Sequence, residues 1–307
     1  MKLKRVIRNG AGFLLATILI LLGFLRSARK KAFEQDVITP IAFHNPSEKL
    51  FRKMVAWLRK KGFVFISAAQ LLDILSGRAV CPRGAIWLSL DDGWRDNLSN
   101  VIPIANKYHI PITIFICTGA VEEGAFWWRK VTQFPDLVPP QFRDVDTLKK
   151  QPEEIRMQII RHIDEAGVSP PLEAMTVDEV KSISVITEID LGAHTDTHPI
   201  LPNCSEKQIE DEIAESTRKL EEWTGKNITV FAYPNGSYDG RERQFLKAKG
   251  YKLAATTEER SAGVNSDPYF FPRHIVMDDG SFAENICHAL GVWAPVIKKI
   301  KQIIRYH

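Results

Sequence analysis

The sequence predicts an α/β fold, a distorted (β/α)7-type barrel with an N-terminal membrane-anchor helix, and three observations lead to this class. Short apolar or β-branched runs alternate with segments of helical periodicity over most of the 307 residues, which is typical of parallel βαβ units. About seven such runs suit a barrel better than an open sheet. Polar residues follow several of the runs directly, at the position where α/β barrels carry their active sites.

The expected strands are short apolar runs, and the expected helices show apolar residues at helical spacing together with capping residues. The strands are residues 38–43, 85–90, 112–118, 188–193, 228–233, 252–257 and 270–276, and residues 63–66 are a short extended run. The helices are residues 48–61, 68–75, 98–108, 153–166, 205–223, 239–249 and 298–305.

These patterns divide the chain into three parts. Residues 1–33 form a membrane anchor with basic flanks, residues 34–290 the barrel, and residues 291–307 a basic C-terminal helix. Between about 120 and 185 the alternation breaks down, which indicates an insertion that shapes a substrate groove. Its aromatic run at 126–128 is expected to pack in the interior, with a sugar-stacking platform as the alternative.

The formal net charge of +4 is unevenly distributed. Residues 1–33 hold eight basic residues and no acidic one, so the rest of the chain carries 33 basic against 37 acidic residues. A nucleic-acid-binding protein usually has its basic excess on the folded domain, whereas here the excess flanks an apolar segment. The distribution argues against a nucleic-acid partner and indicates a membrane.

That apolar segment is AGFLLATILILLGFL, residues 11–25, within an uncharged stretch of 17 residues. This length is at the short end for a membrane-spanning helix. A cleavable signal peptide would need a small-residue site after the apolar run, but RSARKKAF follows. We expect an uncleaved N-terminal anchor, with an interfacial helix as the alternative. Because basic residues lie on both sides, the positive-inside rule assigns no side of the membrane.

The segment GAHTDTHP, residues 192–199, places two histidines four positions apart. In a helix His194 and His198 would share one face, but Pro199 biases His198 away from the helical region. We expect a tight loop or one helical turn after a strand, with both rings directed inward. Such pairs also occur by chance, so a metal site requires a further ligand.

Two adjacent carboxylates in LSLDDGW, residues 88–94, offer that ligand. Asp-Gly after a strand is a common turn, but Asp91 and Asp92 at a buried strand end repel each other unless a cation is present. One aspartate and two histidines give a divalent metal three protein ligands with open positions, as in catalytic sites. The other aspartate can then act as a general base toward water.

Further polar residues end other expected strands, on the same rim of a barrel. They are His44, Tyr233, Asn235, Arg273 and His274. This gathering of polar residues favours chemistry over chance for the histidine pair.

Three segments, LSLDDGW, GAHTDTHP and FAYPNG (231–236), occur in this order. They resemble the first three motifs of the polysaccharide deacetylases, the NodB-homology or carbohydrate esterase 4 group, over roughly residues 38–276. The resemblance implies a distorted (β/α) barrel and metal-dependent N- or O-deacetylation of sugars, usually N-acetylglucosamine residues.

The resemblance also implies roles for individual residues. Asp91 would be the general base, and the metal ligands would be Asp92, His194 and His198. The backbone N–H of Tyr233 would stabilise the oxyanion of the tetrahedral intermediate.

The sequence departs from the family pattern in two places. The family usually takes its general acid from a late histidine, which here is His274, but adjacent strand residues point to opposite faces, so Arg273 and His274 cannot both enter a barrel. We favour His44, at the end of the first strand. In the third motif Ala232 stands where many members have arginine, so an arginine that orients the base would have to be Arg273 or be absent.

The sequence therefore predicts a membrane-anchored, metal-dependent hydrolase that deacetylates a glycan or glycolipid of a bacterial envelope. Zn²⁺ is the first expectation for an Asp-His-His site, with Co²⁺ and Ni²⁺ as alternatives. The alternative function is an inactive glycan-binding protein on the same fold. A different metal hydrolase, such as an amidohydrolase, would carry an early HxH, whereas only FHN stands at 43–45.

Overall fold

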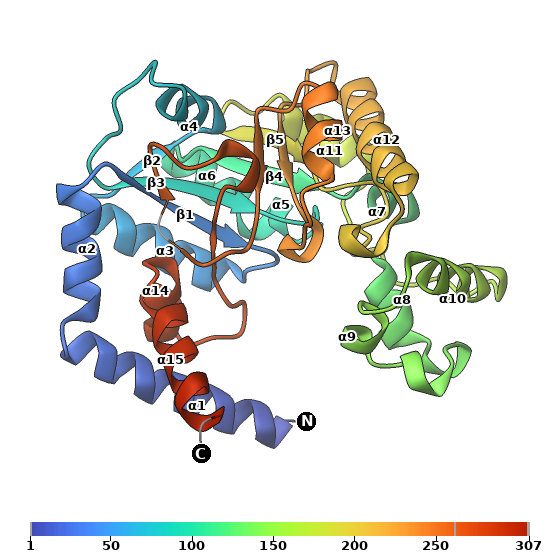
Figure 1. Ribbon diagram of the computed structural model, residues 1–307, viewed down its shortest axis with the longest axis horizontal. Helices are drawn as coiled ribbons and strands as arrows, with labels where there is room; N and C mark the ends of the chain where they lie inside the picture. The colour runs from blue at the N-terminus through green and yellow to red at the C-terminus, as the bar shows by residue number, and fades with distance from the viewer. Residues whose placement is uncertain (1, 261, 306–307) are drawn as a thin grey trace. The chain divides into compact units, whose positions relative to one another are not determined.

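A computed structural model describes residues 2–260 and 262–305 (Figure 1). The chain forms two compact units. The first unit comprises residues 1–90, 97–113 and 257–307, and the second comprises residues 91–96 and 114–256. Both contain parallel strands connected by helices, so the predicted α/β class is confirmed.

The strands of the first unit are arranged around β1 (Val37–Phe43). Parallel to β1 lie β3 (Ala85–Leu90) and β9 (His274–Ile275), while β8 (Ala262–Gly263) is antiparallel to it. Strand β2 (Val64–Ile66) pairs with β3. Six of the seven β1 residues and all of β3 are buried, as expected for parallel strands that are covered on both faces.

Two helices of the first unit begin where the sequence indicates. Ser47 caps α3 (Glu48–Lys60) by accepting a hydrogen bond from the Leu50 N–H, and Ser67 forms a capping box at α4 (Ala68–Leu75). The segment around Pro103 is two short helices, α5 (Asn97–Asn100) and α6 (Ile102–Tyr108), because proline fits only the first turn of a helix.

Two expected elements near the C-terminus differ in length. The run 270–276 yields only the two-residue strand β9, because Pro268–Phe270 form a 3₁₀ turn and Pro272 cannot donate to a ladder. The last helix, α15 (Trp293–Arg305), begins five residues before the expected start at residue 298. It follows α14 (Phe282–Ala289).

The N-terminal segment forms two helices instead of the single expected one. Helix α1 (Lys2–Leu21) ends before Gly23, which has a φ of 82°, and α2 (Phe24–Glu34) begins after it. Among the described residues, no single helix has both the length and the apolar character needed to cross a bilayer. The pair Arg8–Leu21 and Phe24–Glu34, bent by 62°, meets these criteria only jointly, by length and composition.

The second unit places β5 (Ile189–Ala193) between β4 (Ile112–Ile116) and β6 (Val230–Ala232), with β7 (Leu253–Ala255) next to β6. Residues 114–116 of β4 belong to this unit. The pairs β5–β6 and β6–β7 are parallel. Helices α12 (Glu206–Thr224) and α13 (Glu242–Ala248) connect these strands, and Ser205 caps α12 with a capping box.

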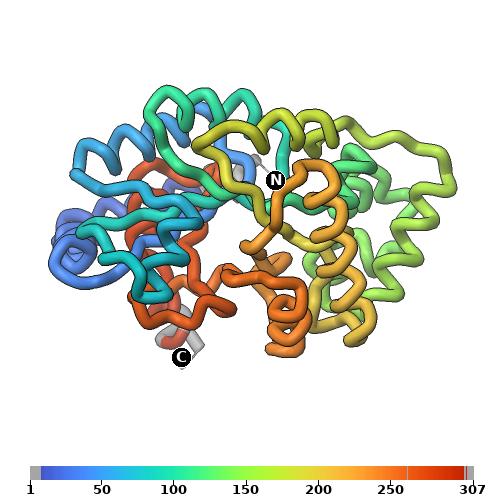
Figure 2. The backbone as a smooth tube through the Cα atoms, turned by 90° about the horizontal axis from the view of Figure 1, so that it is seen from above, coloured from blue at the N-terminus to red at the C-terminus, as the bar shows by residue number. Residues whose placement is uncertain are grey.

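The expected insertion is helical, and it is the green to yellow-green part of the trace in Figure 2. Its helices are α7 (Thr118–Glu123), α8 (Trp127–Gln133), α9 (Val145–Leu148), α10 (Glu153–Glu165) and α11 (Val177–Ser184). The insertion has its own hydrophobic cluster, which includes Trp127, Val131, Ile159 and Ile163. The insertion is therefore a packed element of the second unit.

Candidate metal centre

The histidine motif forms a loop directly after β5, as the sequence predicts. Its first histidine is fixed by a hydrogen bond from the His194 N–H to the Ile116 carbonyl of β4 (2.9 Å). Gly192 permits this close approach, because a Cβ there would lie 2.5 Å from the Phe115 ring and 2.8 Å from the Val230 carbonyl oxygen. The carboxyl ends of β4 and β5 thereby hold the loop in place.

The structure brings Asp92, His194 and His198 together, and one ligand atom from each lies within 4.8 Å of the others. The Asp92 Oδ1 atom is 3.4 Å from His194 Nε2 and 3.5 Å from His198 Nε2. All three residues are at least nine-tenths buried. Asp91, also buried, precedes Asp92 directly after β3.

Outer hydrogen bonds orient the atoms of this cluster. The Ala232 carbonyl lies 2.7 Å from His194 Nδ1. Because a carbonyl only accepts, Nδ1 carries a proton, and Nε2 is the ring nitrogen directed at Asp92. The Trp94 indole N–H donates to Asp92 Oδ2 (2.8 Å), so Oδ1 is the oxygen near both histidines. A carboxylate and two imidazoles supported in this way fit a divalent metal.

The Trp94 hydrogen bond leads to a testable prediction. Trp94→Phe retains a ring beside Phe126, whose centroid is 4.3 Å away, but removes the donor to Asp92. We expect metal affinity to fall by ~10–100-fold, as for other outer-sphere partners, in a competition titration with a zinc chelator. Trp57→Phe, a half-buried tryptophan in α3, is the matched control; equal affinities in the two variants would contradict the assigned role.

Two of the three cluster residues and one residue of the histidine loop have a strained backbone. Asp92, Thr195 and His198 have φ values of 77°, 62° and 57°, in the left-handed region that non-glycine residues seldom adopt. The Thr195 hydroxyl stabilises the loop, because it accepts a hydrogen bond from the His198 N–H (3.1 Å). Such strain is typical of functional sites.

The pKa values of the two histidines are shifted in opposite directions. Burial opposes the charge on His194, but its hydrogen bond to Asp92 and the charges of Asp91 and Asp92 raise the pKa of this imidazole. Burial together with the neighbouring His194 lowers the pKa of His198 to about 3. His198 is therefore neutral at physiological pH, which is the form that binds metals.

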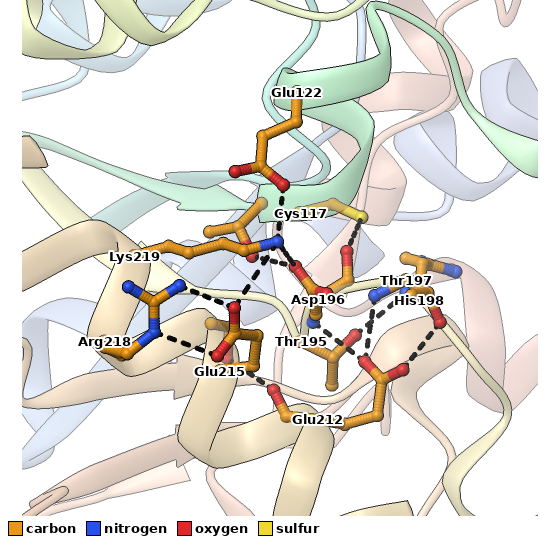
Figure 3. A network of polar contacts seen from close by, with 12 residues as sticks. Cys117, Glu122, Thr195, Asp196, Thr197, His198, Glu212, Glu215, Arg218 and Lys219 are labelled. Atoms are coloured by element: carbon orange, nitrogen blue, oxygen red, sulfur yellow. Dashed lines mark hydrogen bonds and ion pairs between the residues drawn. The ribbon is translucent and has the colours of Figure 1, made fainter.

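A polar network holds the loop from the side of α12, as Figure 3 shows. The Glu212 carboxylate accepts from the N–H groups of Asp196 (2.8 Å) and Thr197 (2.9 Å) and from the Thr197 hydroxyl (2.6 Å). The Lys219 ammonium donates to Asp196 Oδ1 (2.9 Å) and to Glu122 (2.5 Å). These bonds fix the residues between the two histidines.

Glu212 is expected to make stability depend on pH. Burial raises the pKa of Glu212 to about 7, above its value in the unfolded chain, so the folded state binds the proton more tightly. The resulting stabilisation is full below about pH 4.5 and is lost as the pH rises through about 7. Glu212→Gln keeps the shape and should flatten the difference in Tm between pH 5 and pH 8. If the Glu212→Gln variant showed the same difference in Tm between pH 5 and pH 8 as the wild type, other groups would be responsible for the pH dependence.

A cavity of about 490 Å³ adjoins the cluster at His198. Trp128, Ile160 and Arg161 are among the residues that line it. Phe126 and Trp127 are 1% and 4% exposed, which confirms interior packing for these two. Trp128 is half-buried, and its ring lies 4.6 Å from the His198 ring.

The backbone N–H of Tyr233, which the family resemblance assigns to the oxyanion, already has a partner in this structure. It donates to the Ala255 carbonyl of β7 (3.0 Å), so it extends the sheet. Its side chain is fully buried and packs against Phe231 and Tyr238, with both ring centroids 5.4 Å away. Tyr233 is a structural residue of the third motif, whose contribution to the cluster is the Ala232 carbonyl.

The two candidate general acids lie in the first unit. His44 directly follows β1, whereas His274 is level with Ile41 in the β1–β9 register, three residues (~10 Å) before His44. His274 packs against Gly291, where a Cβ would lie 2.6 Å from its ring. Arg273 donates to the Ser89 hydroxyl (3.0 Å). Arg273 and His274 thus have different neighbours, as expected for adjacent strand residues.

Sequence reasoning missed the residues that support the cluster. Trp94 could have been found, because an indole donor two positions after Asp92 lies within the motif itself. Glu212 and Lys219 give no such signal, since they stand in a helix rich in both charges. Arg156, which donates to the Thr197 hydroxyl from α10 (2.8 Å), belongs to the insertion, whose role the sequence leaves open.

Comparison with known proteins agrees with the site. A family model described as polysaccharide deacetylase matches residues 79–254. The poly-β-1,6-N-acetyl-D-glucosamine N-deacetylase of Staphylococcus aureus (strain MSSA476) is 23% identical over 244 residues, which cover 77% of this chain and 69% of that protein. The protein of the same name in Staphylococcus epidermidis (strain ATCC 35984) is 21% identical over the same shares.

Solved structures show the same fold. IcaB from Ammonifex degensii has a TM-score of 0.60 at 22% identity, over 83% of this chain and 97% of that one. The Streptococcus pyogenes deacetylase PplD, in complex with acetate, has a TM-score of 0.59 at 20% identity over the same shares. Since the family model covers more than half of the residues, the chain belongs to the polysaccharide deacetylase family.

Proposed function

We propose that this protein is a metal-dependent N-deacetylase of a bacterial polysaccharide that contains N-acetylglucosamine. The observation that carries the proposal is the buried cluster of Asp92, His194 and His198 with Asp91 beside it. Family membership and the names of the Staphylococcus relatives support the sugar and the amide bond. Zn²⁺ is the metal we expect, with Co²⁺ and Ni²⁺ as functional substitutes.

In this proposal each residue has one task. Asp92, His194 and His198 hold the cation, which when bound polarises the acyl carbonyl and lowers the pKa of water. Asp91 accepts the proton of the attacking water. His44 donates a proton to the leaving amine, so that the C–N bond breaks to give acetate and the free amino sugar.

The proposal is tested with the purified full-length chain. Elemental analysis should find about one divalent ion per chain, and this ion should be absent from the double variant Asp92→Ala, His194→Ala. The wild type should release acetate from oligomers of β-1,6-linked N-acetylglucosamine, lose this activity to a chelator, and regain it with Zn²⁺, Co²⁺ or Ni²⁺. Metal binding without acetate release from N- or O-acetylated glycans would favour a glycan-binding protein on the same fold.

A further inference from the structure

Helix α1 packs on the first unit through one face. Ala16 and Leu19 are buried in a cluster with Cys287 of α14 and Val292. Gly12 belongs to the same face, because a Cβ there would meet the Glu284 carboxylate at 2.8 Å. An ion pair between Arg8 and Asp279 (2.8 Å) fastens the start of this packed region. The helix is therefore an integral element of the first unit.

The opposite face of α1 is also apolar. Six large apolar side chains between residues 13 and 24 are strongly exposed: Phe13 (54%), Leu14 (62%), Ile18 (44%), Leu21 (80%), Leu22 (68%) and Phe24 (47%). Leu14, Ile18 and Leu21 recur at the spacing of one helix face. We call this set of six side chains the outer stripe. A surface helix is normally polar on its outer side, and an apolar patch of this kind indicates a binding surface.

Basic side chains are exposed on the two helices that adjoin α1 in sequence or in packing. Arg26 and Lys30 of α2 are exposed, and so are Lys298 and Lys299 of α15. Helix α15 lies beside α1 (Figure 1), and its Trp293 and Val296 pack against the same cluster. Residues 1–33 contain no acidic side chain. An apolar stripe with basic flanks suits a bilayer that carries anionic headgroups.

We propose that α1 lies in the interface of an anionic bilayer, with the outer stripe among the headgroups and upper acyl chains, and does not span it. To span, α1 would have to leave α14 and α15, expose Ala16 and Leu19, and break the Arg8–Asp279 pair. The 62° bend at Gly23 also opposes a straight span. A second copy of the chain is a poorer occupant, because a symmetric contact would bring the two basic flanks together.

Vesicle flotation of the full-length chain tests the surface. The wild type should float with vesicles of phosphatidylglycerol and phosphatidylcholine, bind pure phosphatidylcholine more weakly, and lose binding as salt rises. The triple variant Leu14→Ser, Ile18→Ser, Leu22→Ser should bind the anionic vesicles at least ~10-fold more weakly than the wild type. The matched control changes two apolar residues elsewhere that are more exposed than these three, Val80→Ser and Val185→Ser (89% and 78% exposed in the wild type). Unchanged binding of the triple variant, or a wild-type dimer that this variant dissociates, would overturn the proposal.

Depth measurements separate an interfacial helix from a spanning one. Single cysteines that replace Leu14, Ile18 or Leu22 are labelled with a fluorophore and quenched by spin labels at shallow and deep lipid positions. An interfacial α1 places all three at one shallow depth, whereas a spanning helix places successive positions ~6 Å apart. A stepwise change in depth from position 14 to 18 to 22 would refute the proposal. Asp91→Asn, a variant of the proposed active site, should float like the wild type, so failure of the deacetylase proposal leaves this one standing.

Discussion

Asp92→Asn is expected to abolish both metal binding and deacetylation, whereas Asp91→Asn should abolish deacetylation alone. Asp92 supplies the oxygen that lies 3.4 Å and 3.5 Å from the two histidine Nε2 atoms, and an amide oxygen in its place is a weak, neutral ligand. Asp91 is buried beside the cluster but does not belong to the group of three potential ligands. The two adjacent residues should therefore separate metal retention from proton transfer.

The expected magnitudes follow from these roles. Loss of a general base typically lowers the rate by ~10²–10⁴-fold, so Asp91→Asn should show a decrease of that size in kcat with about one metal ion still bound per chain. Asp92→Asn should lose more activity, because the metal-dependent terms disappear together with the ion. Metal content is measured by elemental analysis and kcat by acetate release.

Two controls make the pair of variants informative. Excess Zn²⁺ should partly restore Asp92→Asn, whose defect is affinity, but should leave Asp91→Asn unchanged. Both variants should retain the near-UV circular dichroism of the metal-free wild type, which excludes misfolding as the cause. Loss of metal from Asp91→Asn, at an affinity as low as that of Asp92→Asn, would show that the family assignment of the two carboxylates does not hold here.

The sequence predicts the strands and the three cluster residues well because both depend on local patterns. Strands such as 85–90 are runs of apolar residues that can only be buried, and the residue after each run is placed at a strand end by chain connectivity. Asp92, His194 and His198 follow two such strands. Strand positions and chain connectivity therefore suffice to predict that these three residues lie close together.

Other features depend on contacts between distant segments, which no local pattern encodes. Tyr233 occupies a motif position at a strand end, but its N–H is taken by the Ala255 carbonyl, a partner 22 positions further along the chain. The packing of α1 on α14 joins residues about 270 positions apart. The apolar stretch 11–25 predicts a membrane helix from its hydropathy, but hydropathy alone cannot distinguish a face that packs on protein from a face exposed to lipid or water.

His44→Gln is expected to lower the deacetylation rate strongly, while His274→Gln should leave the rate per folded molecule nearly unchanged. A general acid needs a pKa near the working pH. Burial and the nearby His288 lower the pKa of His274 to about 4, so this ring is neutral at pH 7 and lacks the acidic proton of an imidazolium. His44 stands at the end of β1, where the catalytic groups of α/β barrels are placed.

The leaving group provides the decisive measurement for His44. Amide cleavage needs a proton on the departing amine, so His44→Gln should reduce kcat by ~10²–10⁴-fold on an N-acetylated sugar. An activated ester such as 4-nitrophenyl acetate releases a phenolate that needs no proton, and its hydrolysis should therefore fall far less. His274→Gln should instead lower Tm, because His274 is buried against Gly291. A His44 variant equally impaired on both substrates would act through substrate binding or site geometry, and the proton donor would have to be sought elsewhere.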